Sequence, residues 1–544
     1  MQMQRLNRKP FIRKIIASLC ALILCSSAFA FDFSFHLFPS YELPVGGFPN
    51  KEGGFGVNIG FDVTPVTIRL RDKLYVTGQF TYSGFNVSGF GLQSFYDGGL
   101  GAGYSFRFSD RIAAFGEASM GFWSFPGAKN FSEKGVSGLT FAGKLGADFY
   151  VSPALSVTAF AGFKSFYSEP KPFANTVEIG VGIRYSLSRG LFSPDMISLE
   201  EQDVNSLFPV FYARYADNTF GTIKFLNNEP NDIYDVTVSV MVDSYMTTPY
   251  TVSEYEVIER DMYFESPVYA FLNENILDLI QPKTSDMEVT VTYYSLGQKQ
   301  TSSFIMPVTA LSRNSMTWED DRSAAAFVSG KDATAQRFAR QVQSIVKKQL
   351  KSSVPANIQY AAAMFGALKA FGINYVVDPS SAFTDNVGTT AVDFLQFPYQ
   401  TLVYHGGDCD DLTILNCALL EAIGIETAFI TVPGHIYMAF DSGLSAEEGL
   451  SLAETKTKTS KGYYIEYEGK LWVPIEVTLS QDTFSLAWTY GAREWKKAGE
   501  NAALIPLKEA WAEYLPISVP GSDTSIEMPS QEQIIKLFNE AKYY

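Results

Sequence analysis

The sequence is short of positive charge, and this shortage excludes one class of partner. Its 544 residues contain 42 Lys and Arg against 58 Asp and Glu, which gives a formal net charge of −16. Phosphate binding needs a basic surface, so the composition argues against nucleic acid as a partner. Long apolar runs are also absent: after the N-terminal segment, no stretch has about 18 consecutive uncharged apolar residues. We therefore expect no further transmembrane helix, and at this length we expect several domains.

The N-terminal segment has the pattern of an export signal. Basic residues precede the apolar run 15–25, and Ala28-Phe29-Ala30 places small residues at the two positions that signal peptidase reads. The run is too short to favour a retained membrane anchor. Lipidation at Cys25 is a second alternative, but Leu24 stands where a small residue is usual. We expect residues 1–30 to be a signal peptide and the mature chain to be exported.

Cysteine is scarce, and its scarcity is informative. Of the four cysteines, Cys20 and Cys25 leave with the signal, so the mature chain keeps Cys409 and Cys417. If both lie on one helix, eight residues at about 1.5 Å each separate them by about 12 Å, which is beyond disulfide reach. An exported protein that keeps an unpaired cysteine in an oxidising compartment should have a use for it.

The region 31–190 reads as a β-barrel. Aromatic residues reach 15% of the chain and glycines number 42, a mixture that suits β-structure with aromatic girdles. The predicted strands are 32–43, 54–64, 73–84, 95–108, 112–124, 137–151, 155–167 and 176–187. Tight turns at 109–111 and 151–154 contrast with long polar links, which we expect at 44–53, 85–94, 125–136 and 168–175. This arrangement resembles the small eight-stranded antiparallel outer-membrane barrels, with a soluble β-sandwich as the alternative. Eight strands leave no open pore, because side chains fill the lumen.

A second β-domain is predicted over 205–312. Apolar and polar residues alternate in Val236–Val242 and again in Met287–Tyr294, and the turn cluster 227–232 precedes the first of these segments. The region resembles the immunoglobulin-like sandwiches that serve as spacers in cell-surface proteins. That resemblance is architectural and implies no chemistry.

After about residue 320, apolar residues recur at the spacing of a helix and no longer at that of a strand. Residues 333–350 and 357–371 have helical spacing and composition, and a further amphipathic helix is expected at 531–543. We expect an α+β domain over 316–510 and a C-terminal tail with a helix over 511–544.

The most informative stretch of the chain surrounds Cys409. Gly406 and Gly407 permit a sharp turn, and Asp408 is a good N-cap with Asp411 three residues later. Cys409 is therefore expected on the first turn of a helix. There the helix dipole favours a thiolate, and free backbone N–H groups can receive an oxyanion.

A histidine is needed beside this thiol, because the neighbouring aspartates raise its pKa and a cationic imidazole would offset them. The chain has only three histidines, and His36 lies in the first barrel strand. His435 follows a Pro-Gly pair and opens the apolar strand 436–440, so it is the expected base. His405, in the loop before the cysteine, is a candidate for a group that supports the catalytic residues and, as a second choice, for the base.

The third member of a triad should be a carboxylate that orients the imidazole. Asp441 is close in sequence, but six extended residues at about 3.3 Å each would place it about 20 Å from His435. Glu476 is the better candidate. Its strand can pair with Tyr463–Tyr467 across a turn, and an antiparallel arrangement could then bring Glu476 beside His435.

Three motifs in this region resemble the transglutaminase-like cysteine-hydrolase superfamily over about 355–480. They are Gly407-Asp408-Cys409-Asp410-Asp411, Pro433-Gly434-His435 and Trp472-Val473-Pro474-Ile475-Glu476-Val477-Thr478. The resemblance implies a papain-like α+β fold with Cys409 as nucleophile, His435 as base and Glu476 as triad acid, and it requires no cofactor or metal. The sequence departs from the family pattern in two ways: the acid is usually Asp, and the stretch 442–461 looks lengthened.

The resulting prediction is an envelope-associated peptidase, amidase or transamidase. Its substrate would be an amide in a peptide, a protein or a peptidoglycan stem. The barrel would lie in the outer membrane and the C-terminal domain in the periplasm. The alternative is a non-catalytic scaffold that binds peptide or peptidoglycan with a degenerate fold, as some superfamily members have lost activity. At the site itself, Cys409 could be a core residue. The other interpretation is a metal ion bound by Asp408, Asp410, Asp411 and His405.

Overall fold

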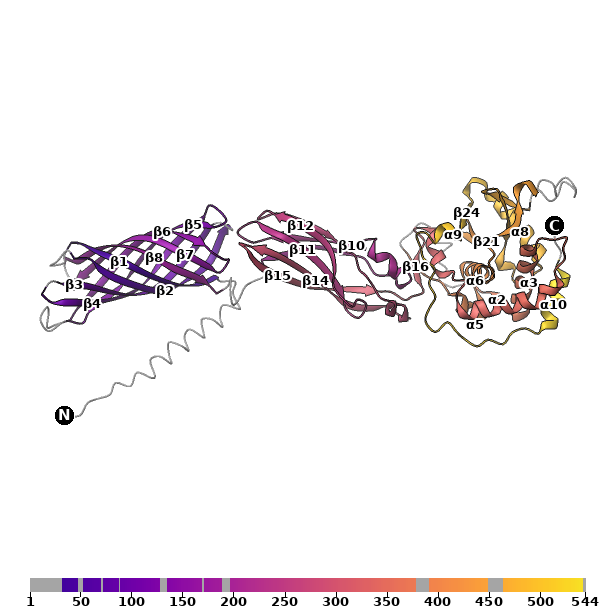
Figure 1. The fold of residues 1–544 in the computed structure, drawn as a ribbon, viewed down its shortest axis with the longest axis horizontal. Coiled ribbons are helices and arrows are strands. Elements are labelled where there is room, and N and C mark those ends of the chain that lie inside the picture. The colour runs from indigo at the N-terminus through magenta and orange to yellow at the C-terminus, as the bar shows by residue number, and fades with distance from the viewer. Residues whose placement is uncertain are drawn as a thin grey trace, which may run out of the picture.

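The computed structural model contains three units that follow one another along its long axis (Figure 1). The described residues are 32–46, 52–69, 72–87, 89–127, 135–168, 171–187, 196–377, 391–448 and 463–541. The predicted signal peptide lies outside these residues. Within them, no helix is both long and apolar enough to cross a membrane.

The first unit is a closed antiparallel barrel in which each strand pairs with its neighbours in sequence and β8 closes on β1. The strands are β1 (Asp32–Gly46), β2 (Gly54–Arg69), β3 (Asp72–Val87), β4 (Gly91–Arg107), β5 (Ile112–Phe125), β6 (Val136–Tyr150), β7 (Leu155–Ser168) and β8 (Lys171–Ser186). The prediction of eight antiparallel strands is therefore confirmed, and the soluble-sandwich alternative is wrong for this unit.

For two of the links between barrel strands, the prediction of a long link is wrong. The predicted links 85–94 and 168–175 are mostly strand, because the hydrogen-bonded ladders continue almost to the turns. The paired residues nearest these turns are Val87 with Gly91 and Ser168 with Lys171. Local glycine, asparagine and proline content suggested loops, but pairing with a neighbouring strand outweighs such local preference.

Side chains alternate between two environments along the barrel strands. Large apolar side chains point outward and are exposed, among them Ile59, Leu100, Phe122, Leu145 and Val181. Polar side chains point inward and are buried, among them Asn58, Thr81, Ser83, Thr158 and Thr176. An apolar outside with a polar inside is typical of a barrel that is surrounded by lipid.

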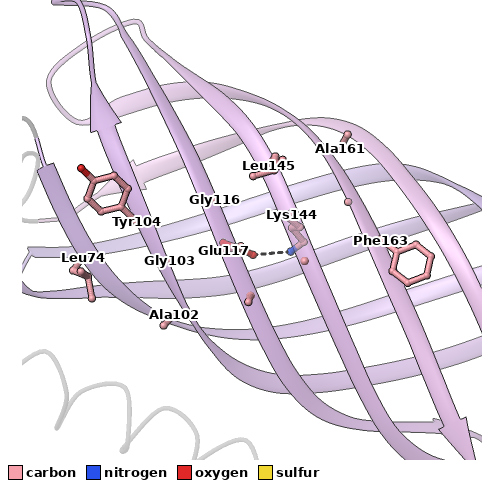
Figure 2. Close-up of a pocket in the computed structure, with 13 residues that line it drawn as sticks. Leu74, Ala102, Gly103, Tyr104, Gly116, Glu117, Lys144, Leu145, Ala161 and Phe163 are labelled. Atoms are coloured by element: carbon pink, nitrogen blue, oxygen red, sulfur yellow. Dashed lines mark ion pairs between the residues drawn. The ribbon is translucent and has the colours of Figure 1, made fainter.

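Charged side chains fill the lumen of the barrel. The Lys164 ammonium lies 3.6 Å from Glu42, 3.4 Å from Asp97 and 3.8 Å from Glu178. A second pair joins Lys144 to Glu117 at 3.2 Å (Figure 2). Three buried aromatic rings pack beside these charges: Phe38, Phe115 and Phe160. The lumen is thus occupied by side chains, as expected for eight strands.

The second unit consists of two sheets with one apolar core between them. The smaller sheet has the order β13-β10-β9 and the larger has the order β12-β11-β14-β15. Their bounds are β9 (Ile197–Val204), β10 (Gly221–Asn227), β11 (Ile233–Val242), β12 (Tyr250–Ile258), β13 (Tyr263–Pro267), β14 (Lys283–Ser295) and β15 (Gln298–Ala310). Phe225 and Phe264 from one sheet join Val238 and Val289 from the other in a single buried cluster.

The third unit is built on a five-stranded sheet of order β22-β23-β21-β20-β24, which helices cover (Figure 1). These strands are β20 (Thr427–Val432), β21 (His435–Ser445), β22 (Ile465–Tyr467), β23 (Lys470–Ile475) and β24 (Ala503–Pro506). The helices are α2 (Ala333–Val346), α3 (Ala356–Phe371), α5 (Pro398–Tyr404), α6 (Cys409–Glu421), α8 (Phe484–Ala498), α9 (Leu507–Ala510) and α10 (Gln531–Glu540). Helix α6 is central: it contacts α2, α3 and α5 as well as the strands β20 and β21.

Shorter elements complete the architecture. The short strands are β16 (Ser315–Thr317), β17 (Asn374–Tyr375), β18 (Val392–Phe394) and β19 (Gly406–Gly407). The 3-10 helices are η1 (Pro209–Ala216), η2 (Glu274–Asp278), η3 (Asp321–Phe327), η4 (Lys347–Gln349), η6 (Val477–Leu479) and η7 (Gly499–Asn501). The buried segment 324–327 is part of the 3-10 helix η3.

The second and third units touch through η1. The Arg214 guanidinium binds Glu513 at 2.5 Å and lies 4.7 Å from the centre of the Tyr514 ring. Phe211 packs against the same ring with 5.5 Å between ring centres. Apolar, aromatic and ionic contacts therefore join the two units at this junction.

Candidate active site

Cys409 is the first residue of α6, and the residues before it hold the helix start in place. Asp408 is the N-cap, and its side chain accepts a hydrogen bond from the Asp411 N–H. His405 adopts a left-handed backbone conformation with φ +59° at the end of α5. A Cβ atom on Gly407 would lie 2.4 Å from the Cβ of Asp411, so only glycine fits at this position.

The Cys409 thiol is buried, with 5% of the residue exposed. Burial raises the pKa of this thiol, and the nearby Asp410 and Asp408 raise it further. The backbone N–H groups of Ile436 and Asp410 donate hydrogen bonds to the sulfur and lower the pKa, but burial outweighs them. The resting thiol therefore keeps its proton, and a neighbouring base must remove it.

His435 directly precedes Ile436, whose N–H donates to the Cys409 sulfur, at the start of β21. Its Nε2 is 2.8 Å from Glu476 Oε2. The imidazole also stacks on the Tyr437 ring with 5.6 Å between ring centres, and the Tyr437 hydroxyl donates to the carbonyl of Gly491 at 3.1 Å. With Nε2 bound to the carboxylate, Nδ1 is the nitrogen left to exchange a proton with the thiol.

Glu476 is buried and its oxygens are fully engaged. Its second oxygen, Oε1, accepts hydrogen bonds from the Thr478 N–H at 3.1 Å and from the Thr478 hydroxyl at 2.6 Å. Burial acts to raise the pKa of Glu476, but the hydrogen bond and charge of His435 and the two Thr478 donors together hold it below its usual value. The carboxylate is therefore ionised at neutral pH and can orient the imidazole.

Strand pairing brings Glu476 to His435. Strands β21 and β23 are antiparallel, with Met438 opposite Ile475. Glu476 directly follows Ile475, and its side chain reaches the histidine at the start of the neighbouring strand. Asp441, the alternative acid, lies farther along β21 opposite Trp472 and binds Lys470 at 3.2 Å.

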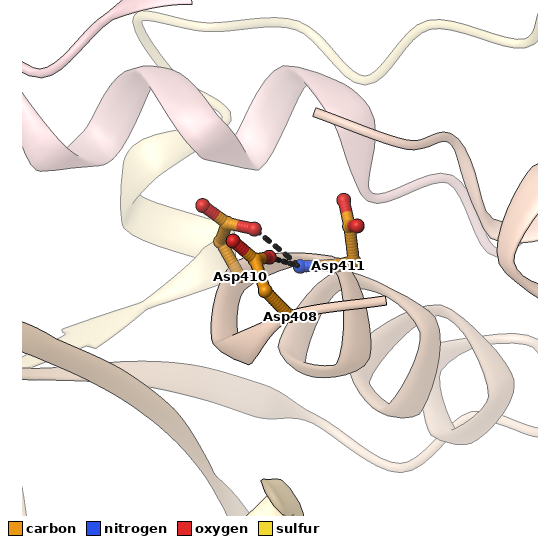
Figure 3. Close-up of side chains that lie close together, drawn as sticks. All are labelled: Asp408, Asp410 and Asp411. Atoms are coloured by element: carbon orange, nitrogen blue, oxygen red, sulfur yellow. Dashed lines mark hydrogen bonds between the residues drawn. The ribbon is translucent and has the colours of Figure 1, made fainter. Parts of the chain in front are cut away.

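Three aspartates gather at the start of α6 (Figure 3). Asp408, Asp410 and Asp411 each place a carboxylate oxygen within 4.8 Å of the others. The Asp411 N–H donates to Asp410 at 2.7 Å and to Asp408 at 3.5 Å. Burial and mutual repulsion raise the pKa of Asp410 well above its usual value and that of Asp411 to about 8.

These oxygens are the donors that a hard divalent cation prefers, but the surroundings favour a structural role. Asp408 and Asp410 both accept the hydrogen bond of the Asp411 N–H at the helix start. His405, the fourth member of the metal alternative, does not join them. Its Nδ1 is 3.1 Å from the Phe371 carbonyl oxygen, and its ring stacks on the Phe371 ring at 4.4 Å.

The other residues that the sequence singled out lie apart from this site. His36 is inside the barrel, with Nε2 2.9 Å from Asn58 Oδ1. Cys417 is also on α6 but is completely buried, and neither cysteine forms a disulfide. One residue near the site was missed: Tyr375 on β17 pairs with Gly407 of β19. No motif marks it, because only the pairing of two short strands brings it there.

No protein-family model matches the sequence. No curated protein matches it either. Three solved structures that resemble this chain each cover 28% of it. Neisserial surface protein A is 14% identical over 96% of its own chain, with a TM-score of 0.24. Ail, the attachment invasion locus protein of Yersinia pestis, is 20% identical over 97% of its chain, with a TM-score of 0.21. The N-terminal β-barrel domain of Pseudomonas aeruginosa OprF is 11% identical over 96% of its chain, with a TM-score of 0.20. The closed eight-stranded barrel of the N-terminal unit is established by its own strand pairing.

Proposed function

We propose that the third unit is a transglutaminase-like cysteine hydrolase with Cys409 as nucleophile, His435 as base and Glu476 as the acid that orients the base. The observation that carries the proposal is the position of His435. Its Nε2 is 2.8 Å from Glu476 Oε2, and the next residue along the chain, Ile436, hydrogen-bonds the Cys409 sulfur. A nucleophile, a base and an orienting carboxylate in this order are the requirements for acyl transfer by cysteine.

The reaction would proceed by transfer of the thiol proton to His435 and attack of the sulfur on an amide carbonyl. The N–H of Cys409, at the first position of α6, has no carbonyl within the helix to pair with and can receive the oxyanion. His435 then gives its proton to the leaving amine as the carbon–nitrogen bond breaks. Water releases the acyl group in a peptidase or amidase, and a second amine releases it in a transamidase.

In this proposal, the barrel determines on which side of the outer membrane the third unit lies. A lipid-facing barrel with an even number of strands returns the chain to the side of the membrane from which it entered. After export through a signal peptide, that side is the periplasm, so the third unit would work in the periplasm on an amide of a peptide, a protein or a peptidoglycan stem.

The second unit would act as an immunoglobulin-like spacer between the membrane and the enzyme. Its longest strands, β14 and β15, have 13 residues each. At about 3.3 Å per residue such a strand spans about 43 Å, which would hold the third unit well away from the membrane surface. The third unit lies at the far end of the molecule from the barrel (Figure 1).

Alkylation of the full-length protein in detergent micelles tests the proposal. Iodoacetamide at neutral pH should modify Cys409 rapidly, and His435→Ala should slow that modification because the base is lost. Cys417, on the same helix but fully buried, is the internal control. Profiling with peptide and muropeptide libraries, with Cys409→Ala as the blank, would then identify the amide that is cleaved. If Cys409 is as inert as Cys417, the third unit is a non-catalytic binding module instead.

A further inference from the structure

The end of the second unit that lies nearer the barrel meets the last turns of the barrel (Figure 1). Pro230, in the turn between β10 and β11, is buried and lines one small cavity together with Arg107 and Tyr150 of the barrel. Arg107 is the last residue of β4 and Tyr150 is the last residue of β6. The turn that carries Pro230 therefore lies against this end of the barrel.

Exposed aromatic and apolar side chains flank the same end of the second unit. On the larger sheet, Tyr234 of β11 is directly opposite Val257 of β12 and Tyr294 of β14, and all three are exposed. On the smaller sheet, Met262 and Tyr263 are exposed at the start of β13. These five residues, called the barrel-side patch below, lie on the outer faces of both sheets.

The barrel-side patch does not continue along the larger sheet. The next two rows across the outer face of that sheet consist of hydroxyl side chains: Thr237, Thr292 and Thr301, then Ser239, Thr290 and Ser303. Successive rows are two residues apart, which is about 7 Å along a strand. Whatever covers the patch is therefore a layer about one row deep at the barrel end, and not a partner that lies along the whole sheet.

The apolar outer surface of the barrel continues to this end. Phe108 and Val151 are exposed in the turns that directly follow β4 and β6. Tyr234 follows Pro230 by four residues, and four residues of chain span at most about 14 Å. The barrel-side patch thus begins where the lipid-facing surface of the barrel ends.

We infer that the barrel-side patch binds the phospholipid headgroup region of the bilayer that holds the barrel. Tyrosine suits this region, because its ring can enter apolar surroundings while its hydroxyl stays in water. The headgroup region on each side of a bilayer is about 5 to 8 Å thick, which matches a patch one row deep. This contact would fix the direction in which the second unit leaves the membrane, and it does not depend on the chemistry of the third unit.

The charges around the patch indicate which lipids it fits. Four exposed acidic residues adjoin it in the sequence: Asp235, Glu256, Glu259 and Asp261. Lys299, opposite Tyr294, and the half-buried Arg260 offset only part of this negative charge. Anionic headgroups are attracted by clusters of basic residues, and the patch has none. The contact is therefore aromatic and apolar, and its partner is a zwitterionic phospholipid.

Fluorescence quenching in phosphatidylcholine vesicles tests the inference on the full-length protein. A bimane label is placed at Lys299→Cys, in the row of the patch, or at Ser303→Cys, on the same face of β15 but two rows farther from the barrel. Cys409→Ala in both proteins limits labelling to the new cysteine, since Cys417 is fully buried. Phosphatidylcholine with a spin-labelled headgroup should quench most of the fluorescence at position 299 and little at position 303. Adding phosphatidylglycerol should not increase the quenching.

A second variant tests whether the tyrosines themselves make the contact. Tyr234→Thr combined with Tyr294→Thr should reduce the quenching at position 299 to the level at position 303, and threonine keeps a side chain that suits a strand. Unchanged quenching in this variant would mean that the barrel alone brings this end to the bilayer, which contradicts the inference. Weak quenching at both positions of the otherwise unchanged protein would show that the second unit stays clear of the membrane. A label at position 299 that is shielded from water but not quenched, increasingly so at higher protein-to-lipid ratios, would show that a second copy of the chain covers the patch instead.

Discussion

The imidazole of His435 and the carboxylate of Glu476 are joined by a 2.8 Å contact across 41 positions of sequence. The pairing of β21 with β23 makes this contact, and two hydrogen bonds from Thr478 hold the carboxylate in place. The arrangement leaves Nδ1 of His435 free for the thiol. It therefore favours Glu476 over Asp441 as the acid of the proposed triad, as the sequence predicts.

Glu476→Gln should lower turnover strongly, because the neutral amide no longer stabilises the imidazolium that forms during the reaction. The loss expected for a triad acid is up to about 10⁴-fold in kcat. Asp441→Asn is the matched control. It removes only the contact with the half-exposed Lys470, so it should leave turnover unchanged and cost at most about 1 kcal/mol of stability. Steady-state kinetics of both variants checks this, and the reverse ranking would refute the assignment of the acid.

The two cysteines on α6 should respond to substitution in opposite ways. Cys409→Ala should abolish amidase activity and leave the fold intact, because alanine suits the first turn of a helix. Cys417→Ala should retain activity but lower the free energy of unfolding by about 1 kcal/mol, because the cysteine is fully buried. Activity assays and thermal unfolding of the two variants make the comparison. Activity that survives in Cys409→Ala would rule out this cysteine as nucleophile.

Asp411 should make the third unit less stable as the pH rises. Its pKa in the folded protein is about 8, raised chiefly by burial and then by the charge of Asp408. The folded state therefore binds more protons than the unfolded state between about pH 4 and pH 8, and stability falls across that window. Asp411→Asn cannot ionise, and its side-chain oxygen can still accept the hydrogen bond from the Gln396 N–H.

The unfolding temperature of the Asp411→Asn variant should therefore fall less between pH 5 and pH 9 than that of the original protein, and at pH 9 it should be higher than that of the original protein. Tryptophan fluorescence is a suitable measurement, since the third unit contains Trp318, Trp472, Trp488, Trp495 and Trp511. Asp441→Asn, a change of the same kind outside the cluster of three aspartates, is the control variant. A parallel pH dependence in Asp411→Asn and the original protein would contradict a raised pKa at this position.

The location of the third unit can be tested on intact cells. If the barrel spans the outer membrane, protease added outside should cut only the barrel loops and leave the chain beyond about residue 190 intact. Permeabilising the outer membrane should then expose that part to digestion. Immunoblotting against the C-terminal helix follows both steps. Release of the third unit into the medium from intact cells would show that it faces outward.

The N-terminal unit shows what a repeating pattern of residues can predict about a fold. Alternating apolar and polar residues predict eight strands correctly, because each strand must place one face on the outside of the barrel and the other in the lumen. The lengths of the turns were harder to predict. Gly91 and Lys171 lie in segments that look like loops, and hydrogen bonding to a neighbouring strand makes them part of the ladder.

At the candidate site, the sequence by itself determined the chemistry of the helix start. Two glycines, an N-capping aspartate and a cysteine in consecutive positions place that cysteine on the first turn of α6, because the local backbone and the cap depend on neighbours in the chain. Only the tertiary structure decided which distant groups surround that cysteine. Glu476 approaches His435 through the pairing of two strands, Tyr375 reaches the nucleophile loop through a two-residue strand, and stacking on Phe371 holds His405 away. These outcomes depend on register and packing between segments far apart in the chain, which no local pattern of residues encodes.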